Sequence, residues 1–145
     1  MRGTVPLRLV DLLFQSAHLL VVEYDYFTPL DLTMGAPSRR AAAFADHINT
    51  EGLAAALDSA ETVTKLAYDE LETVRVYDGG WIGRETVAIE PLTGTTQIVR
   101  VHGSVDLDQF IDAVRSVLSS YAVDVERRNG LAFEFNGMLG RLSRR

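Results

Sequence analysis

The stretch TVRVYDGGWIGRETVAIEPLTGTTQIVRVHG, residues 73–103, decides the fold class. It contains three runs rich in β-branched residues, which favour strands. The runs are 73–77, 84–90 and 95–103. Asp78-Gly79 predicts a tight hairpin turn after the first run, because both residues tolerate the positive φ that such turns require. A second turn is predicted at 91–94, so the three strands form an antiparallel meander.

A helix and a second hairpin are predicted after the meander. Asp106 and Gln109 resemble a capping box, which marks a helix N-terminus. The helix is predicted to end near Tyr121 and to bury Leu107, Phe110, Ile111, Val114, Val117 and Leu118. The segment 123–136, with its turn at Asn129-Gly130, alternates apolar and polar residues and predicts a hairpin with one packed face.

The N-terminal segment 7–17 is predicted to be a helix. Its polar residues and the following histidine are spaced by three, four and three positions, as in a polar stripe along a helix. They are Arg8, Asp11, Gln15 and His18. A helix that is apolar around the rest of its circumference must be covered on more than one side, by the core or by a partner subunit. Leu9 and Leu13 are the contact residues that we expect if a partner covers it.

The remaining part of the first half mixes a strand with helices. A strand is predicted at 19–27, and a loop with two prolines at 28–38. Ser38 is predicted to cap a helix that ends at Ile48, and another helix begins at residue 49 or 50. The segment 62–68 fits either the end of that second helix or a strand, because it contains several β-branched residues.

These elements predict one α+β domain over residues 1–145. Strands joined by tight turns give a mainly antiparallel sheet, expected as a single layer of five or six strands with about four helices packed on it. The basic tail at 138–145 is expected either to contact an acidic neighbour or to be a solvated terminus. Its arginines are Arg141, Arg144 and Arg145.

Composition excludes several classes of protein. The 145 residues include 20 acidic and 14 basic residues, with a net charge of −6, and no cysteine. This balance disfavours nucleic-acid binding, which depends on clustered basic residues, and the lack of cysteine rules out a disulfide scaffold. No run approaches the roughly 20 apolar residues of a membrane span. Arg8 and Asp11 interrupt the only segment that resembles a secretory signal, so we expect a cytoplasmic protein.

No metal, cofactor or serine nucleophile is predicted. The three histidines, His18, His47 and His102, do not have the spacing of metal ligands. The sequence contains no Gly-x-Ser-x-Gly motif. We therefore expect a protein without a bound metal or cofactor.

Glu23, Asp25, Arg100 and His102 are the candidate catalytic residues. Glu23 and Asp25 are two positions apart on a predicted strand, so they are expected on one face, about 7 Å apart, where two carboxyl groups can share acid–base work. Arg100 and His102 share a face of the third meander strand, and His102 would pair with one of the carboxylates if the strands were adjacent. The alternative is that all four are solvated surface residues.

The turn Gly79-Gly80-Trp81-Ile82-Gly83 contains the only tryptophan of the chain. It is not a phosphate-binding loop, because no helix is predicted to follow it. Either the turn displays Trp81 and Ile82 as an anchor for a protein partner, or Trp81 folds back onto the core.

Two functions follow from these features. The first is a non-catalytic protein–protein interaction or assembly module that associates with itself through the first helix, the Trp81 turn and the basic tail. The alternative is a small-molecule-binding protein or enzyme with an acid–base site on the sheet. This alternative requires a concave, mostly apolar pocket on which the candidate residues converge.

Overall fold

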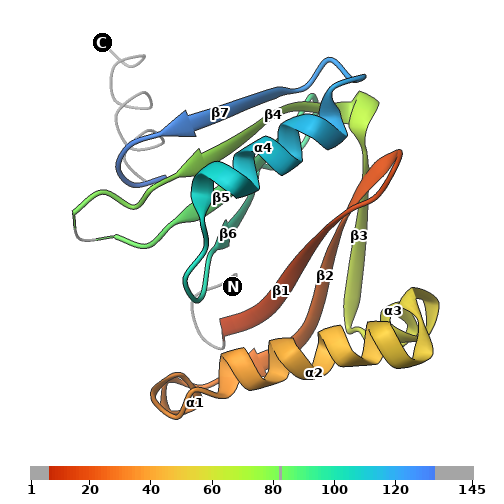
Figure 1. The fold of residues 1–145 in the computed structure, drawn as a ribbon, viewed down its shortest axis with the longest axis vertical. Helices are drawn as coiled ribbons and strands as arrows, with labels where there is room; N and C mark the ends of the chain where they lie inside the picture. The colour runs from red at the N-terminus through yellow and green to blue at the C-terminus, as the bar shows by residue number, and fades with distance from the viewer. Residues whose placement is uncertain (1–6, 82, 133–145) are drawn as a thin grey trace.

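A computed structural model describes residues 7–81 and 83–132, which form seven strands and four α-helices (Figure 1). Their order is β1 (Leu7–Phe14), β2 (His18–Phe27), α1 (Pro29–Thr33), α2 (Ala36–Glu51), α3 (Leu53–Ser59), β3 (Thr62–Ala67), a 3-10 turn η1 (Tyr68–Glu70), β4 (Leu71–Tyr77), β5 (Thr86–Pro91), β6 (Gln97–Arg100), α4 (Leu107–Leu118) and β7 (Asp124–Arg128). The predicted α+β class, with four helices and mainly antiparallel strands, is confirmed.

The strands are divided between two sheets instead of the single layer that we expected. The first sheet has the order β1-β2-β3 and the second the order β6-β5-β4-β7. All pairs are antiparallel except β4 and β7. The division arises at η1, where a single 3-10 turn separates β3 of the first sheet from β4 of the second.

The helix predicted over residues 7–17 is wrong, because this segment forms β1 and the turn after it. β1 is covered on both faces. Val10, Leu12 and Phe14 pack into the core shared with the second sheet, whereas Leu13 packs with Leu20 on the helix side. A strand buried on both faces has a continuous apolar run without alternation, so its sequence resembles that of a buried helix.

The turn between β1 and β2 is bound to the second half of the molecule. The Tyr68 hydroxyl donates to the Gln15 carbonyl oxygen at 2.6 Å, and the Tyr121 hydroxyl donates to that of Ser16 at 3.0 Å. The Tyr68 backbone N–H donates to the Ala17 carbonyl oxygen at 3.3 Å. Three consecutive carbonyl groups of the turn therefore bind it to η1 and to the segment after α4.

The region predicted as a loop, 28–38, contains α1 and the start of α2. Thr28 and Asp31 form a capping box, in which the Thr28 N–H donates to the Asp31 carboxylate at 2.8 Å. Pro29 and Pro37 occupy the first or second helical position, where a proline costs no helical hydrogen bond. They start helices here, although we interpreted them as loop signals. For the segment 62–68 we left open whether it ends a helix or forms a strand. The structure shows a strand, β3.

The C-terminal helix is confirmed, but it ends at Leu118 and not near Tyr121, and Val117, which we predicted to be buried, is exposed. Asp106 caps α4 by accepting a hydrogen bond from the Gln109 N–H at 3.0 Å, and the buried stripe contains Ile111, Val114 and Leu118. The next strand, β7, is parallel to β4 and is not paired in a hairpin within the described residues. Most of the predicted partner strand, from residue 133, and the basic tail lie outside the described residues.

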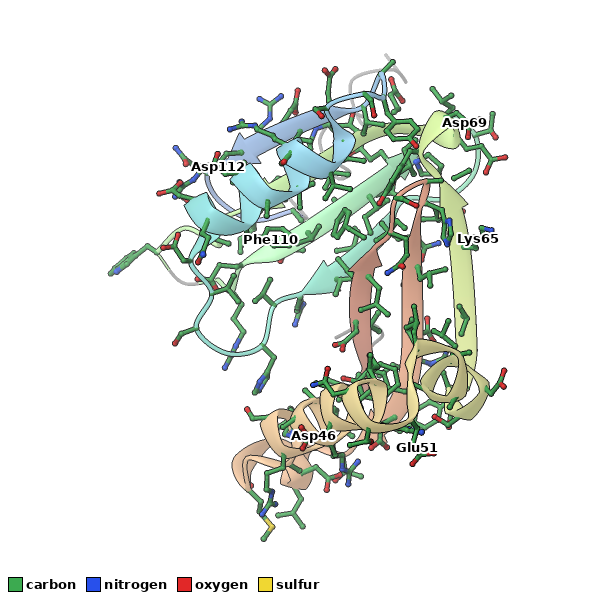
Figure 2. The ribbon with its side chains drawn as sticks, turned by 45° about the vertical axis from the view of Figure 1, so that its right-hand side comes forward. Asp46, Glu51, Lys65, Asp69, Phe110 and Asp112 are labelled. Carbon is green, nitrogen blue, oxygen red and sulfur yellow. The ribbon has the colours of Figure 1, made fainter. Side chains whose placement is uncertain are left out.

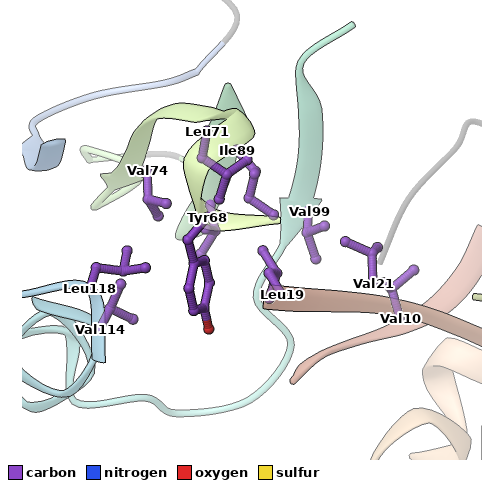
Figure 3. Close-up of a cluster of buried hydrophobic side chains, with 11 residues drawn as sticks. Val10, Leu19, Val21, Tyr68, Leu71, Val74, Ile89, Val99, Val114 and Leu118 are labelled. Atoms are coloured by element: carbon purple, nitrogen blue, oxygen red, sulfur yellow. The ribbon is translucent and has the colours of Figure 1, made fainter. Parts of the chain in front are cut away.

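Two apolar clusters hold the layers together. The larger lies between the two sheets and α4, with Tyr68 at its centre (Figure 3). The other lies between the first sheet and α2–α3, where the rings of Tyr24 and Phe44 stack with centroids 4.0 Å apart. The remaining surface of α2 exposes polar residues such as Asp46 and Glu51 together with several alanines (Figure 2).

Candidate functional site

A cavity of about 300 Å³ lies where the edges of the two sheets approach each other. β1 is an edge strand of the first sheet and β6 an edge strand of the second. Parts of α2, of β5, and of the connection into α4 complete the wall. Most of the lining is apolar and consists of Leu9, Val10, Leu12, Pro37, Ala41, Val87, Val99, Val101, Val105, Leu107 and Phe110. Four polar residues interrupt it: Asp11, Ser38, Arg100 and His102.

The backbone of β1 contributes further polar groups to the cavity wall. The Gln15 N–H donates to the His18 carbonyl oxygen at 2.9 Å, which sets the alternation of hydrogen-bonded pairs along the hairpin. By this alternation, the N–H and C=O groups of Val10 and Leu12 point away from β2. Both residues line the cavity, so this wall has backbone donors and acceptors between apolar side chains.

Asp11 is a site residue that the sequence analysis missed. Its side chain is half-buried, and the Tyr24 hydroxyl donates to its Oδ1 at 3.2 Å. Burial raises the pKa of Asp11, and the hydrogen bond from Tyr24 opposes this shift. Burial and the charge of Asp11 in turn raise the pKa of Tyr24, so this phenol remains protonated. We assigned Asp11 to a polar helix stripe, and no local signal indicated a cavity residue.

His102 lies at the opposite wall, just after β6. Burial is the main cause that lowers its pKa, and the positive charge of Arg84 lowers it further. Arg100, at the end of β6, also lines the cavity and is exposed. The lining therefore contains one guanidinium group and one imidazole on the β6 side of the cavity.

Glu23 and Asp25 do not join this site. The residue between them, Tyr24, is the extra residue of a β-bulge in the pairing with β1, and a bulge interrupts the alternation of side chains. Glu23 is buried and pairs with Arg8 at 2.5 Å, whereas Asp25 pairs with Arg40 of α2 at 3.1 Å. The prediction that the two carboxylates share one face as a coupled pair is therefore wrong.

The Trp81 loop, residues 78–85 between β4 and β5, is the second unusual feature. Trp81 is 98% exposed, so the structure decides for display over burial. The base of the loop is bound to the segment after β7. Asp78 Oδ1 accepts hydrogen bonds from the N–H groups of Gly80 and Gly130, both at 2.9 Å, and the Gly79 N–H donates to the Gly130 carbonyl oxygen at 3.1 Å.

Glycines permit this loop geometry. Gly79 and Gly80 have φ angles of +78° and +59°, which L side chains rarely adopt. A Cβ atom on Gly79 would lie 2.7 Å from the carbonyl carbon of Arg84. A Cβ atom on Gly83 would collide with the Leu131 side chain and the Gly79 carbonyl oxygen. The loop therefore holds Trp81 in solvent on a tightly closed base.

The hydrogen bonds to Asp78 predict a pH dependence. The backbone N–H groups of Gly130 and Gly80 lower the pKa of Asp78 below its ordinary value of 3.8. The stabilisation is present above that value and is lost as the pH falls through the lower folded-state pKa. We expect the melting temperature of the Asp78→Asn variant to fall less steeply with acid than that of the wild type. Parallel profiles between pH 2 and 7 would contradict this expectation.

The other residues predicted to make contacts have different positions. Leu9 is only 5% exposed, and Leu13 packs against the cluster of Leu20 and Phe44, so both belong to the core of this chain. The helix surface on which we placed them does not exist, because the segment is a strand. Ile82, Arg141, Arg144 and Arg145 lie outside the described residues.

Comparisons with known proteins add no family: no family model, curated protein or solved structure matches this chain. Within residues 7–81 and 83–132, no three potential metal-ligating side chains cluster. In the same part of the chain, no helix has the length and apolarity to cross a membrane.

Proposed function

We propose that this chain is a non-catalytic protein–protein interaction module that associates with itself through the Trp81 loop. The observation that carries the proposal is the 98% exposure of Trp81 on a loop with a closed base. Tryptophan and arginine are the residues most enriched among interface hot spots. The Trp81 loop contains one of each. Arg84 is separated from Trp81 by two residues and is also exposed.

A closed loop base favours binding. A side chain on a flexible loop loses conformational entropy when it docks, whereas a preorganised loop has less to lose. The hydrogen bonds of Asp78, Gly79 and Gly130 supply this preorganisation. Each part of the base makes backbone contacts, so the position of Trp81 depends little on its own side-chain packing.

Local charge complementarity, and not net charge, would favour a second copy as the partner, because two copies of the same net charge repel each other overall. The chain has a net charge of −6, and the Trp81 loop exposes both the indole of Trp81 and the cation of Arg84. A cationic and aromatic anchor is complementary to an acidic surface, and each copy provides both. A homodimer with the same patch on both subunits would satisfy this complementarity.

Replacing Trp81 by alanine is expected to weaken self-association about 30-fold or more, because truncation of a hot-spot residue costs about 2 kcal/mol or more. The fold should not change, since the side chain contacts solvent. Sedimentation equilibrium over a wide range of concentration measures the effect. The wild-type mass should rise above the 16.0 kDa of the monomer, and the variant should stay near it.

Leu92→Ala is the matched control, because Leu92 is also exposed, at 60%, and lies on the next connection, between β5 and β6. It should associate as the wild type does. The fluorescence of Trp81 gives an independent readout, since the emission of the only tryptophan should shift to the blue as association buries it. A wild-type chain that remains monomeric at every concentration would overturn the proposal, as would equal association of the Trp81→Ala variant.

A further inference from the structure

We propose that the cavity between β1 and β6 is a binding site for a small carboxylic acid with an apolar body. The carboxylate would lie toward Arg100 and His102, and the apolar body would lie between the two sheet edges. No described residue of the Trp81 loop lines this cavity, although Arg84 of that loop influences His102, and the site gives the chain a second function.

The size and the lining of the cavity define the apolar part of the ligand. Small-molecule sites have volumes of about 300–1,000 Å³ and mostly apolar walls with a few polar groups. This cavity, at about 300 Å³, is at the lower limit and has room for a short aliphatic chain or one ring. Phe110 of α4 belongs to the wall, and its ring meets Phe14 edge to face, with centroids 6.3 Å apart. The wall is thus supported by core packing.

The charges around the cavity define the polar part of the ligand. Arg100 and His102 line one end, and Arg84 is close enough to lower the pKa of His102. A guanidinium group has five N–H donors, so the exposed Arg100 can bind a carboxylate in addition to its partner within the chain. A carboxylate at this end would be attracted by the guanidinium group of Arg100 and would favour the protonated form of His102.

Asp11 sets the orientation of the ligand. Its carboxylate is half-buried in the β1 wall, held by the Tyr24 hydroxyl at 3.2 Å. A second carboxylate beside it would be repelled, so the acid group of the ligand must lie at the end of Arg100 and His102. Removing the charge of Asp11 should therefore strengthen anion binding, whereas removing that of Arg100 should weaken it.

His102 adds a pH dependence of defined sign. A bound carboxylate favours the imidazolium form, so binding should raise the pKa of His102 from its lowered value in the free protein. By linkage, affinity for the acid must increase as the pH falls through this range, as long as the ligand remains ionised.

The test uses hexanoate and hexan-1-ol as probes, which share an apolar chain and differ in charge. Binding to the full chain is followed by the backbone amide NMR signals of residues 9–12 and 99–102. We expect saturable shifts of these signals with hexanoate and about ten-fold weaker binding of hexan-1-ol, because a charge-assisted hydrogen bond is lost. Absence of saturable shifts with hexanoate, or equal affinity for both probes, would overturn the proposal.

Variants with opposite expected effects separate electrostatics from damage to the fold. Arg100→Gln should weaken hexanoate binding about ten-fold, and Asp11→Asn should strengthen it several-fold. Lys65→Gln is the control, because it removes the same charge from β3, at the opposite edge of the first sheet (Figure 2). It should bind as the wild type does. Equal affinities of Arg100→Gln and the wild type would overturn the assignment.

Ala41→Leu gives a test that does not depend on charge. Ala41 of α2 lines the cavity, so the larger side chain should occupy space that the ligand needs and abolish the binding of both probes. The Trp81→Ala variant should bind hexanoate normally. This result separates the cavity from the self-association proposed above, because either function can fail while the other stands.

Discussion

Replacing Tyr68 by alanine is expected to lower the free energy of unfolding by about 3–5 kcal/mol, the range for removal of a large aromatic side chain from a core. Tyr68 is 1% exposed and lies in the cluster between the two sheets and α4 (Figure 3). Its ring meets that of Tyr121 at a centroid distance of 4.9 Å. The variant removes this packing and the hydrogen bond to Gln15 in the turn between β1 and β2.

Tyr68→Phe separates packing from hydrogen bonding. It keeps the ring but leaves the Gln15 carbonyl oxygen without the hydroxyl donor, so it should cost only about 1–2 kcal/mol. Urea unfolding followed by circular dichroism measures both variants. If the alanine variant lost no more stability than the phenylalanine variant, Tyr68 would not be the packing centre that the structure indicates.

Replacing Gly79 by alanine is expected to cost about 2–5 kcal/mol in stability. The left-handed conformation costs about 1–2 kcal/mol for an L residue, and overpacking adds about 1–3 kcal/mol. The overpacking is unavoidable, because the new Cβ would lie 2.7 and 2.8 Å from backbone carbons of Arg84 and Gly83. Neither neighbour can rotate away without moving the chain.

Gly35→Ala is the matched control for this prediction. Gly35 has a φ of +67°, similar to that of Gly79, but a Cβ atom there would meet nothing within 4 Å. This variant should lose only the conformational part, about 1–2 kcal/mol. The two variants are compared by urea unfolding, and equal losses would show that the close backbone approach at Gly79 does not matter. Gly79→Ala should also weaken self-association, since it disturbs the base of the Trp81 loop.

Local signals predicted the strands of the meander and the helix α4, whereas the hairpin predicted over 123–136 was replaced, within the described residues, by a strand parallel to β4. The cap at Asp106 acts within a few residues, so it is readable from sequence. The tight turn predicted at Asp78-Gly79 is instead a longer loop over residues 78–85, in which Gly79 and Gly80, but not Asp78, have positive φ. The stripe of α4 was also readable, because this helix is covered on one side and exposed on the other. Such an element keeps the periodicity of its own geometry.

Burial on both faces removed this periodicity from β1. Its residues meet the core between the sheets on one face and the helix layer on the other, so apolar residues occupy nearly every position. A strand and a helix that are buried in this way have the same apolar sequence pattern. In β1 the pairing with β2 decides for the strand. The same limit applies to Leu9 and Leu13, which we interpreted as contact residues of an exposed helix surface.

The candidate site residues likewise divide into those that the sequence singled out and those that only the tertiary structure placed. The sequence singled out Trp81, Arg100 and His102 by type and by place on a strand or turn, but it could not bring Asp11 to the cavity. Asp11 is distant in sequence from β6, and only the approach of two sheet edges places it in the same wall. The pairing of Glu23 and Asp25 with different arginines depends on a bulge, which the sequence did not indicate.

By itself, the sequence determined the α+β class, the meander and the capped C-terminal helix, since each depends on the conformational preferences of neighbouring residues. The exposure of Trp81 was left open by the sequence and was decided by the structure. Only the tertiary structure decided the division into two sheets, the conformation of the first segment and the position of the cavity. These depend on contacts between residues far apart in the chain, whose free energy comes from burying apolar surface in whichever arrangement covers it best.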